Sequence, residues 1–138
     1  MKNYLFAVLS LSFFIACGSN KSDRAGADEA DTVAVIYGWE AALNDSTGKL
    51  EMNKLEHGGP DSLTAASVIA YLNKQNPNVQ LKLLKTSGDT LYVKIPDAMY
   101  LTQQMGSSGP QIFFAETVYN LTEIPGIKYV NFDFEEGD

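Results

Sequence analysis

The chain is predicted to fold as an α+β two-layer sandwich, in which a small mixed or antiparallel sheet carries two helices on one face. Segments typical of β-strands are interspersed with two segments whose apolar residues have helical spacing. Turn-forming residues separate all of these segments, so each element is short. The order along the chain is strand, strand, helix, hairpin, helix, strand. Helices laid on one face of the sheet would bury both apolar helical stripes.

The folded part is expected to begin with two strands. Residues 32–37 (TVAVIY) are a continuous β-branched and aromatic run, which is the pattern of a strand covered on both faces. Residues 44–48 (NDSTG) are a cluster of turn residues. Residues 49–56 then alternate Leu50 and Met52 with polar residues, which predicts the second strand.

The first helix is expected to follow and to run to about Gln75. Residues 58–60 (GGP) break the preceding strand, and Asp61 or Ser62 can cap the helix. Asn76-Pro77 ends it, because the residue before a proline is disfavoured in a helix. The residues expected on its buried face are Ala65, Val68, Ile69 and Leu72.

Residues 79–95 are expected to form a β-hairpin. Apolar and polar residues alternate over residues 79–83 and again over residues 91–95. The turn-forming residues 87–89 (SGD) lie between the two strands.

The second helix and the last strand complete the pattern. Residues 108–111 (SGPQ) match a capping box, with Pro110 in the first turn of a helix that runs to about Thr122. The residues expected to point inward from this helix are Phe114, Val118 and Leu121. A last strand over residues 127–135 is expected to turn one apolar face to the helices, formed by Val130, Phe132 and Phe134.

The composition excludes several classes of function. Seventeen acidic and ten basic residues give a net charge of −7, and such a surface repels nucleic-acid phosphates. One His and one Cys exclude the common structural zinc sites, and the chain has no EF-hand loop. We therefore expect no nucleic-acid partner, no metal and no cofactor. We also expect no catalytic residue, because the acidic clusters are explained as solvated segments.

The first seventeen residues have the build of a secretory signal. Lys2 precedes an apolar run over residues 4–16, which is shorter than the roughly 20 residues that span a bilayer. Cys17 follows the small Ala16, and this layout resembles a bacterial lipoprotein signal. The resemblance implies a signal peptide over residues 1–16, lipidation of Cys17 and a periplasmic or surface-facing place in the cell envelope. Residues 17–30 would then form a flexible tether to a domain over residues 31–138.

The C-terminal half carries a second group of motifs. These are residues 89–97 (DTLYVKIPD), residues 106–109 (GSSG), a helix ending in Asn120-Leu121-Thr122 and residues 123–130 (EIPGIKYV). Together they resemble the GerMN module of sporulation and spore-germination proteins. The resemblance implies a cell-envelope lipoprotein with a fold similar to the ring-building modules of secretion and sporulation assemblies. Residues 39–57 depart from the pattern.

Partner binding is expected in the segment that joins the strand at 91–95 to the second helix. The residues that nominate it are Met99, Tyr100, Leu101 and Met105. Met and Tyr are adaptable anchors at binding surfaces, and loops often carry function. The alternative is that Tyr100 and Leu101 close the end of the sheet. We expect a non-enzymatic module that binds a protein or cell-wall component through this segment or through a sheet edge.

Two other functions stay open at this point. Residues 57–59 (HGG) are similar to the loop that supplies an oxyanion hole in esterases, so a small envelope hydrolase would pair His57 with a serine of residues 106–109. The Gly-x-Ser-x-Gly turn of that family is missing. The other function is a self-associating homo-oligomer, which the ring-building resemblance allows.

Four Asp-Ser or Asp-Thr pairs, each followed by an apolar residue or Thr, resemble a bacterial O-glycosylation site. The acceptors would be Thr32, Ser46, Ser62 and Thr90. Such pairs are also natural helix caps and turns, which is the alternative explanation.

Overall fold

The computed structural model describes residues 36–135 of the chain, and the structural statements below refer to them. The predicted signal peptide, Cys17, the tether, the acceptor Thr32 and most of the predicted first strand lie outside the described residues. Within the described part, no helix is both long enough and apolar enough to cross a bilayer.

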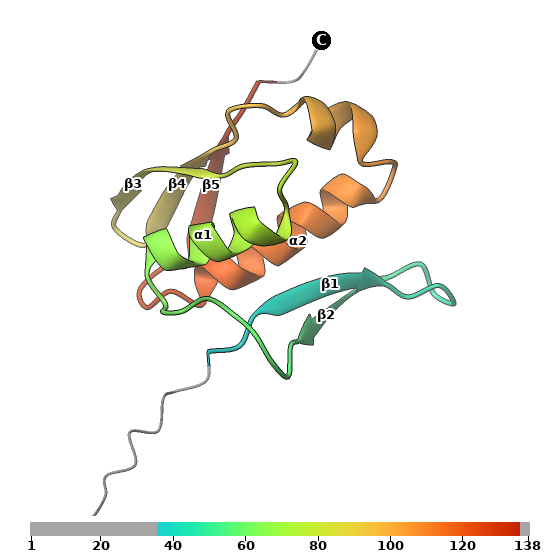
Figure 1. Ribbon diagram of the computed structural model, residues 1–138, viewed down its shortest axis with the longest axis horizontal. Coiled ribbons are helices and arrows are strands. Elements are labelled where there is room, and N and C mark those ends of the chain that lie inside the picture. The colour runs from blue at the N-terminus through green and yellow to red at the C-terminus, as the bar shows by residue number, and fades with distance from the viewer. Residues whose placement is uncertain (1–35, 136–138) are drawn as a thin grey trace, which may run out of the picture. The chain divides into compact units, whose positions relative to one another are not determined.

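Five strands, two α-helices and one short π-helix make up the described part (Figure 1). The strands are β1 (Trp39–Leu43), β2 (Leu50–Lys54), β3 (Lys82–Ser87), β4 (Thr90–Lys94) and β5 (Tyr129–Asp133). The helices are α1 (Ala65–Gln75), the π-helix η1 (Tyr100–Gln104) and α2 (Gly109–Thr122).

The predicted α+β class is confirmed. Strands β3, β4 and β5 form a mixed sheet in that order, with β3 antiparallel and β5 parallel to β4. Helices α1 and α2 pack against each other and cover one face of this sheet, which gives the two layers (Figure 1). The first two strands do not join that sheet. They form a separate antiparallel hairpin, and β1 packs against α2.

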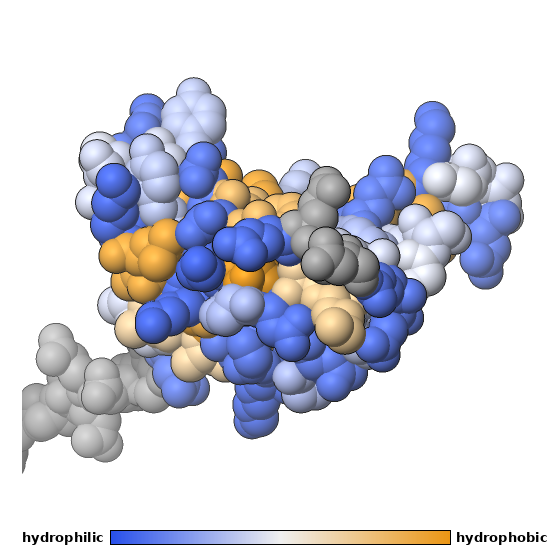
Figure 2. Space-filling model, turned by 90° about the horizontal axis from the view of Figure 1, so that it is seen from above, coloured by the Kyte–Doolittle hydropathy of each residue, from blue (hydrophilic) through white to orange (hydrophobic). Residues whose placement is uncertain are grey.

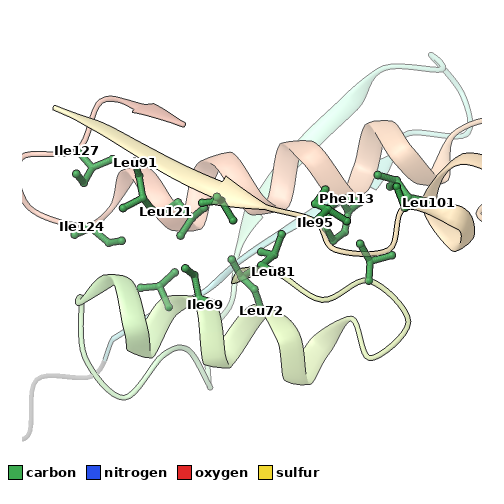
Figure 3. Packing of buried hydrophobic residues seen from close by; sticks show 14 residues of the cluster. Ile69, Leu72, Leu81, Leu91, Ile95, Leu101, Phe113, Leu121, Ile124 and Ile127 are labelled. Atoms are coloured by element: carbon green, nitrogen blue, oxygen red, sulfur yellow. The ribbon is translucent and has the colours of Figure 1, made fainter. Parts of the chain in front are cut away.

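The hydrophobic core lies between the three-stranded sheet and the helices. Val68, Ile69 and Leu72 of α1 are buried, as the predicted stripe requires. Figure 3 shows Ile69 and Leu72 pointing from α1 toward Leu91 of β4 and Leu121 of α2. The two strands of the predicted hairpin meet at a turn in which Gly88 has a φ of +60°, a conformation that glycine adopts without strain.

The buried face of α2 differs from the prediction. Its buried residues are Phe113, Thr117, Asn120 and Leu121. Phe114 and Val118, which the apolar spacing places inward, are only half-buried. Phe114 nevertheless points toward the sheet, as predicted, because its ring centroid lies 5.0 Å from that of Phe132 and 5.9 Å from that of Phe134. Because α2 packs against both the sheet and the hairpin, it buries side chains on more than one side, and spacing alone does not fix its orientation.

Several element boundaries also differ from the prediction. Ile36 and Tyr37, the described end of the predicted first strand, are not in a strand, and β1 lies over residues 39–43, where no strand was predicted. Val79 and Leu81 are buried, but they lie in the segment that leads into β3. A register shift between Leu83 and Lys85 interrupts the pairing of β3 with β4, which breaks the simple alternation of the sequence.

The helix caps follow the prediction only in part. The first helix is capped by Thr64 rather than by Asp61 or Ser62, because Thr64 Oγ1 accepts a hydrogen bond from the Ser67 N–H at 3.2 Å. It ends at Gln75, as predicted, with Asn76 in the C-cap position. Ser108 occupies the cap position of α2, with Pro110 in the first turn, but its side chain makes no capping hydrogen bond.

The face of the sheet away from the helices carries polar and aromatic residues. Lys85 Nζ lies 4.7 Å from the centre of the Tyr92 ring, and Lys94 Nζ lies 3.7 Å from Asp133 Oδ2. Leu84, at the edge strand β3, is 48% exposed. Figure 2 shows one face of the described part, on which hydrophilic side chains border a smaller hydrophobic area.

We expect Leu91→Ala to lower the free energy of unfolding by about 2–5 kcal/mol, because Leu91 is fully buried and its truncation leaves a cavity. The matched control is Leu84→Ala, which removes the same atoms from an exposed position and should cost less than about 1 kcal/mol. Urea denaturation of the two variants measures the difference. Equal losses would contradict this description of the core.

Candidate functional site

The edge of β1 that faces away from β2 is completed by side chains of α2. In an antiparallel pair, alternate N–H groups point away from the partner strand, and here they include those of Trp39 and Ala41. Asn120 Oδ1 accepts a hydrogen bond from the Trp39 N–H at 3.0 Å, and Asn120 Nδ2 donates to the Trp39 carbonyl at 2.9 Å. Glu116 Oε1 accepts from the Ala41 N–H at 3.0 Å. These two side chains therefore take the place of a neighbouring strand.

The indole of Trp39 is fixed at the same junction. Its Nε1 donates a hydrogen bond to Glu123 Oε1 at 2.9 Å, and its ring meets Tyr119 edge-on at 5.4 Å between centroids. Lys54 Nζ lies 5.7 Å from the centre of the ring. The hairpin is thus held to α2 by polar and aromatic contacts as well as by the buried Ala41.

A hollow of about 430 Å³, which we call the acidic pocket, lies between the hairpin, α1 and α2. Its lining residues are Trp39, Glu40, Leu55, Tyr71, Leu72, Gln75, Asn76, Ile112 and Glu116. Two of them are carboxylates and two are aromatic, and none is Lys, Arg or His. None of the ion pairs found among the described residues includes Glu40 or Glu116.

The charges at the acidic pocket disfavour one another. Burial raises the pKa of Glu116 above its usual 4.5, and the Glu40 carboxylate raises it further, although the hydrogen bond from Ala41 acts in the opposite direction. Burial also raises the pKa of Tyr71 above 10.0, with additional contributions from Glu116 and Glu40. Each of these charge–charge contributions raises a pKa, so the electrostatic potential at the pocket is negative.

Tyr71 forms the wall between the acidic pocket and a second hollow of about 440 Å³. Its hydroxyl packs against the backbone of Gly38, where a Cβ would overlap the ring. The second hollow also contacts the loop before α1 and contains Lys74. A third hollow, of about 180 Å³, shares Gln75 and Asn76 with the acidic pocket. The three hollows therefore adjoin one another along α1.

The structure separates the four predicted partner-binding residues. Met99 is 50% exposed, and the half-buried Tyr100 and Met105 line the third hollow. Leu101 is only 2% exposed and belongs to the hydrophobic core. The alternative explanation therefore holds for Leu101: η1 turns this side chain inward, where a partner does not reach it.

The residues of the hydrolase alternative do not come together. His57 is exposed in the loop between β2 and α1. Residues 106–108 precede α2, which begins at Gly109, and Figure 1 shows the two loops on different sides of the helices. None of the three hollows above is lined by His57. Among residues 36–135, no three His, Cys, Asp or Glu side chains are grouped so that they could hold a metal ion.

The predicted glycosylation acceptors within the described part differ in exposure. Ser46 is exposed in the turn between β1 and β2. Ser62 is half-buried, with its Oγ 2.6 Å from Ser67 Oγ, and Thr90 is half-buried beside Asp89. The O-glycosylation of these residues stays a prediction.

Sequence reasoning missed the acidic pocket and the joint between β1 and α2. One signal was available, because Glu116 and Asn120 are four residues apart and so share one face of the helix. Their partners in β1 lie 75 and 81 residues away along the chain, and no local pattern indicates that pairing.

We expect Asn120→Ala to lower the free energy of unfolding by about 2–3 kcal/mol, because it leaves both polar groups of the Trp39 backbone without a partner. Trp39 is the only tryptophan, so its fluorescence should shift to the red as the hairpin loosens. The control is Asn131→Ala, at an exposed asparagine of β5. The same loss and the same shift in both variants would contradict the assigned role of Asn120.

Comparisons of the chain with protein-family models, with curated proteins and with solved structures gave no match. The GerMN resemblance therefore stays a prediction.

Proposed function

We propose that the chain is a non-enzymatic, GerMN-like binding module, held at the cell envelope by a lipid on Cys17, that binds a protein or cell-wall partner along α1. The observation that carries the proposal is the row of three adjoining hollows. Helix α1 has eleven residues and is therefore about 16 Å long, which is room for about five residues of an extended chain. An elongated partner could occupy all three hollows.

The position of the predicted partner-binding residues supports the same surface. Tyr100 and Met105 line the third hollow, and Met99 is exposed beside them on the chain. The partner surface proposed here thus runs from the loop before α1, past Tyr71 and Gln75, to η1. We favour binding over catalysis, because a catalytic nucleophile and its base must lie within hydrogen-bond reach of each other. His57 and the serines of residues 106–109 lie in separate loops.

The envelope location is tested by Cys17→Ser. A single cysteine follows the apolar run, so the lipid should supply the lasting membrane attachment. We expect the variant to leave the membrane fraction or to retain its signal peptide, which mass spectrometry detects. Wild-type fractionation together with wild-type mass would contradict lipid anchoring.

The partner surface is tested by site-specific photo-crosslinking in cells. A photoreactive amino acid at Gln75, which borders two of the hollows, should give a discrete crosslinked product. The same group at Met99 should give a product of the same mass, because both positions belong to one surface. The control position is Asn131, on the opposite face of the sheet, which should give none. Crosslinks from Asn131 alone would place the partner elsewhere and contradict the proposal.

A further inference from the structure

We propose that the acidic pocket binds a primary alkylammonium group of the partner, such as the side chain of a lysine or of a related diamino acid. This inference rests on the proposed function, since it names the chemical group that the partner would insert beside α1. It assigns a ligand class to the hollow between the hairpin, α1 and α2.

The first argument is the charge of the lining. Glu40 and Glu116 face a hollow that contains no basic residue, and neither makes an ion pair with a described cation. Lys74 lines the neighbouring hollow, on the other side of Tyr71, and Lys54 lies over the rings of Tyr37 and Trp39. A bound cation would relieve the repulsion between the two carboxylates, whereas a neutral ligand would leave it in place.

The second argument is the apolar and aromatic part of the lining. Leu55, Leu72 and Ile112 offer a surface on which the methylene stem of a lysine can pack while its ammonium group reaches the carboxylates. Trp39 and Tyr71 supply aromatic rings at the same hollow, and aromatic rings attract organic cations. A bare metal ion would use none of these groups, because Ca²⁺ takes six to eight oxygen ligands.

The third argument distinguishes an ammonium from a guanidinium. Arginine binds a carboxylate best through two parallel hydrogen bonds, which need both carboxylate oxygens. Glu116 Oε1 already accepts the hydrogen bond of the Ala41 N–H at 3.0 Å. An ammonium needs only one oxygen from each carboxylate, whereas a bidentate guanidinium at Glu116 would share Oε1 with the Ala41 N–H, so Glu116 suits lysine better than arginine.

The test uses the full-length protein and the fluorescence of Trp39, the only tryptophan, which lines the pocket. Lysine blocked at both backbone ends should give a saturable change in fluorescence. The Nε-acetylated form of the same compound is neutral and should bind at least tenfold more weakly, and blocked arginine should also bind more weakly. Equal binding of the neutral compound would overturn the inference and would indicate an apolar or sugar-like ligand instead.

Two variants localise the binding. Glu40→Gln and Glu116→Gln should each weaken binding of blocked lysine about tenfold. Glutamine keeps an oxygen that can accept the Ala41 hydrogen bond, so the hairpin should stay docked in Glu116→Gln. The control is Glu135→Gln, which removes the same charge from an exposed position after β5. A tenfold loss in the control, or no loss in either pocket variant, would overturn the assignment.

The pH dependence gives an independent measurement. Because the pKa of Glu116 is raised, this carboxyl takes up a proton at a higher pH than an ordinary glutamate as the pH falls from 7. As the pH is lowered from 7 toward 4.5, the affinity for blocked lysine should therefore fall, because Glu116 loses its negative charge. In Glu116→Gln the affinity should change less over the same pH interval. Glu40 and Tyr71 line the same hollow and are present in both the wild type and the variant, so a difference between the two pH profiles is due to Glu116. An unchanged profile in the variant would contradict the role of Glu116.

A competition experiment separates this inference from the proposed function and tests the source of the amine. Excess blocked lysine should suppress the crosslink formed from Gln75. A crosslink that persists under saturating amine would agree with the proposed binding function but would overturn the assignment of the pocket to an ammonium group. The amine can come from a cell-wall peptide or from a lysine of a protein. To distinguish them, the competitor is replaced by a peptide that ends in a diamino acid with a free α-carboxylate. Stronger suppression by it indicates a wall peptide, and weaker suppression indicates a protein lysine.

Discussion

Among the contacts that place the β1–β2 hairpin against α2, the amide of Asn120 is central because it makes two of the hydrogen bonds to β1. It both donates to and accepts from the backbone of Trp39, a pairing that a neighbouring strand would normally supply. A third hydrogen bond, from Asn120 Nδ2 to the Glu116 carbonyl at 2.8 Å, fixes the amide on its own helix. Since Asn120 is 2% exposed, water does not replace these bonds easily. The acidic pocket exists because this joint holds the hairpin against α2 while α1 lies beside it.

Much of the fold follows from local patterns in the sequence. From β2 onward the order of the elements is as predicted apart from η1, and β4 buries Leu91 and Val93 on the expected face. These predictions succeed because strand alternation and turn residues act over a few neighbouring positions. The orientation of α2 is not local in this sense. It is set by contacts with two different sheets, so Phe113 is buried and Phe114 is turned toward β5.

The candidate site could be predicted less well than the fold. The segment around η1 was indicated by its Met and Tyr residues, and Tyr100 and Met105 do border a hollow. Leu101 has a similar apolar character, yet it is buried, and only the three-dimensional packing distinguishes it from its neighbours. Glu40, Tyr71 and Glu116 belong to three different elements. Sequence alone gave no reason to bring these three residues together.

The attachment of the hairpin by side chains has a consequence for local unfolding. The main-chain ladder of β3, β4 and β5 does not include β1 or β2, so the hairpin can detach while that sheet stays paired. The amide hydrogens of Trp39 and Ala41 would then exchange with solvent deuterium through a partial opening rather than through global unfolding. The open form has no pocket between hairpin and helices. Any ligand of that pocket would therefore slow the exchange of these two amides, by mass action on the closed form.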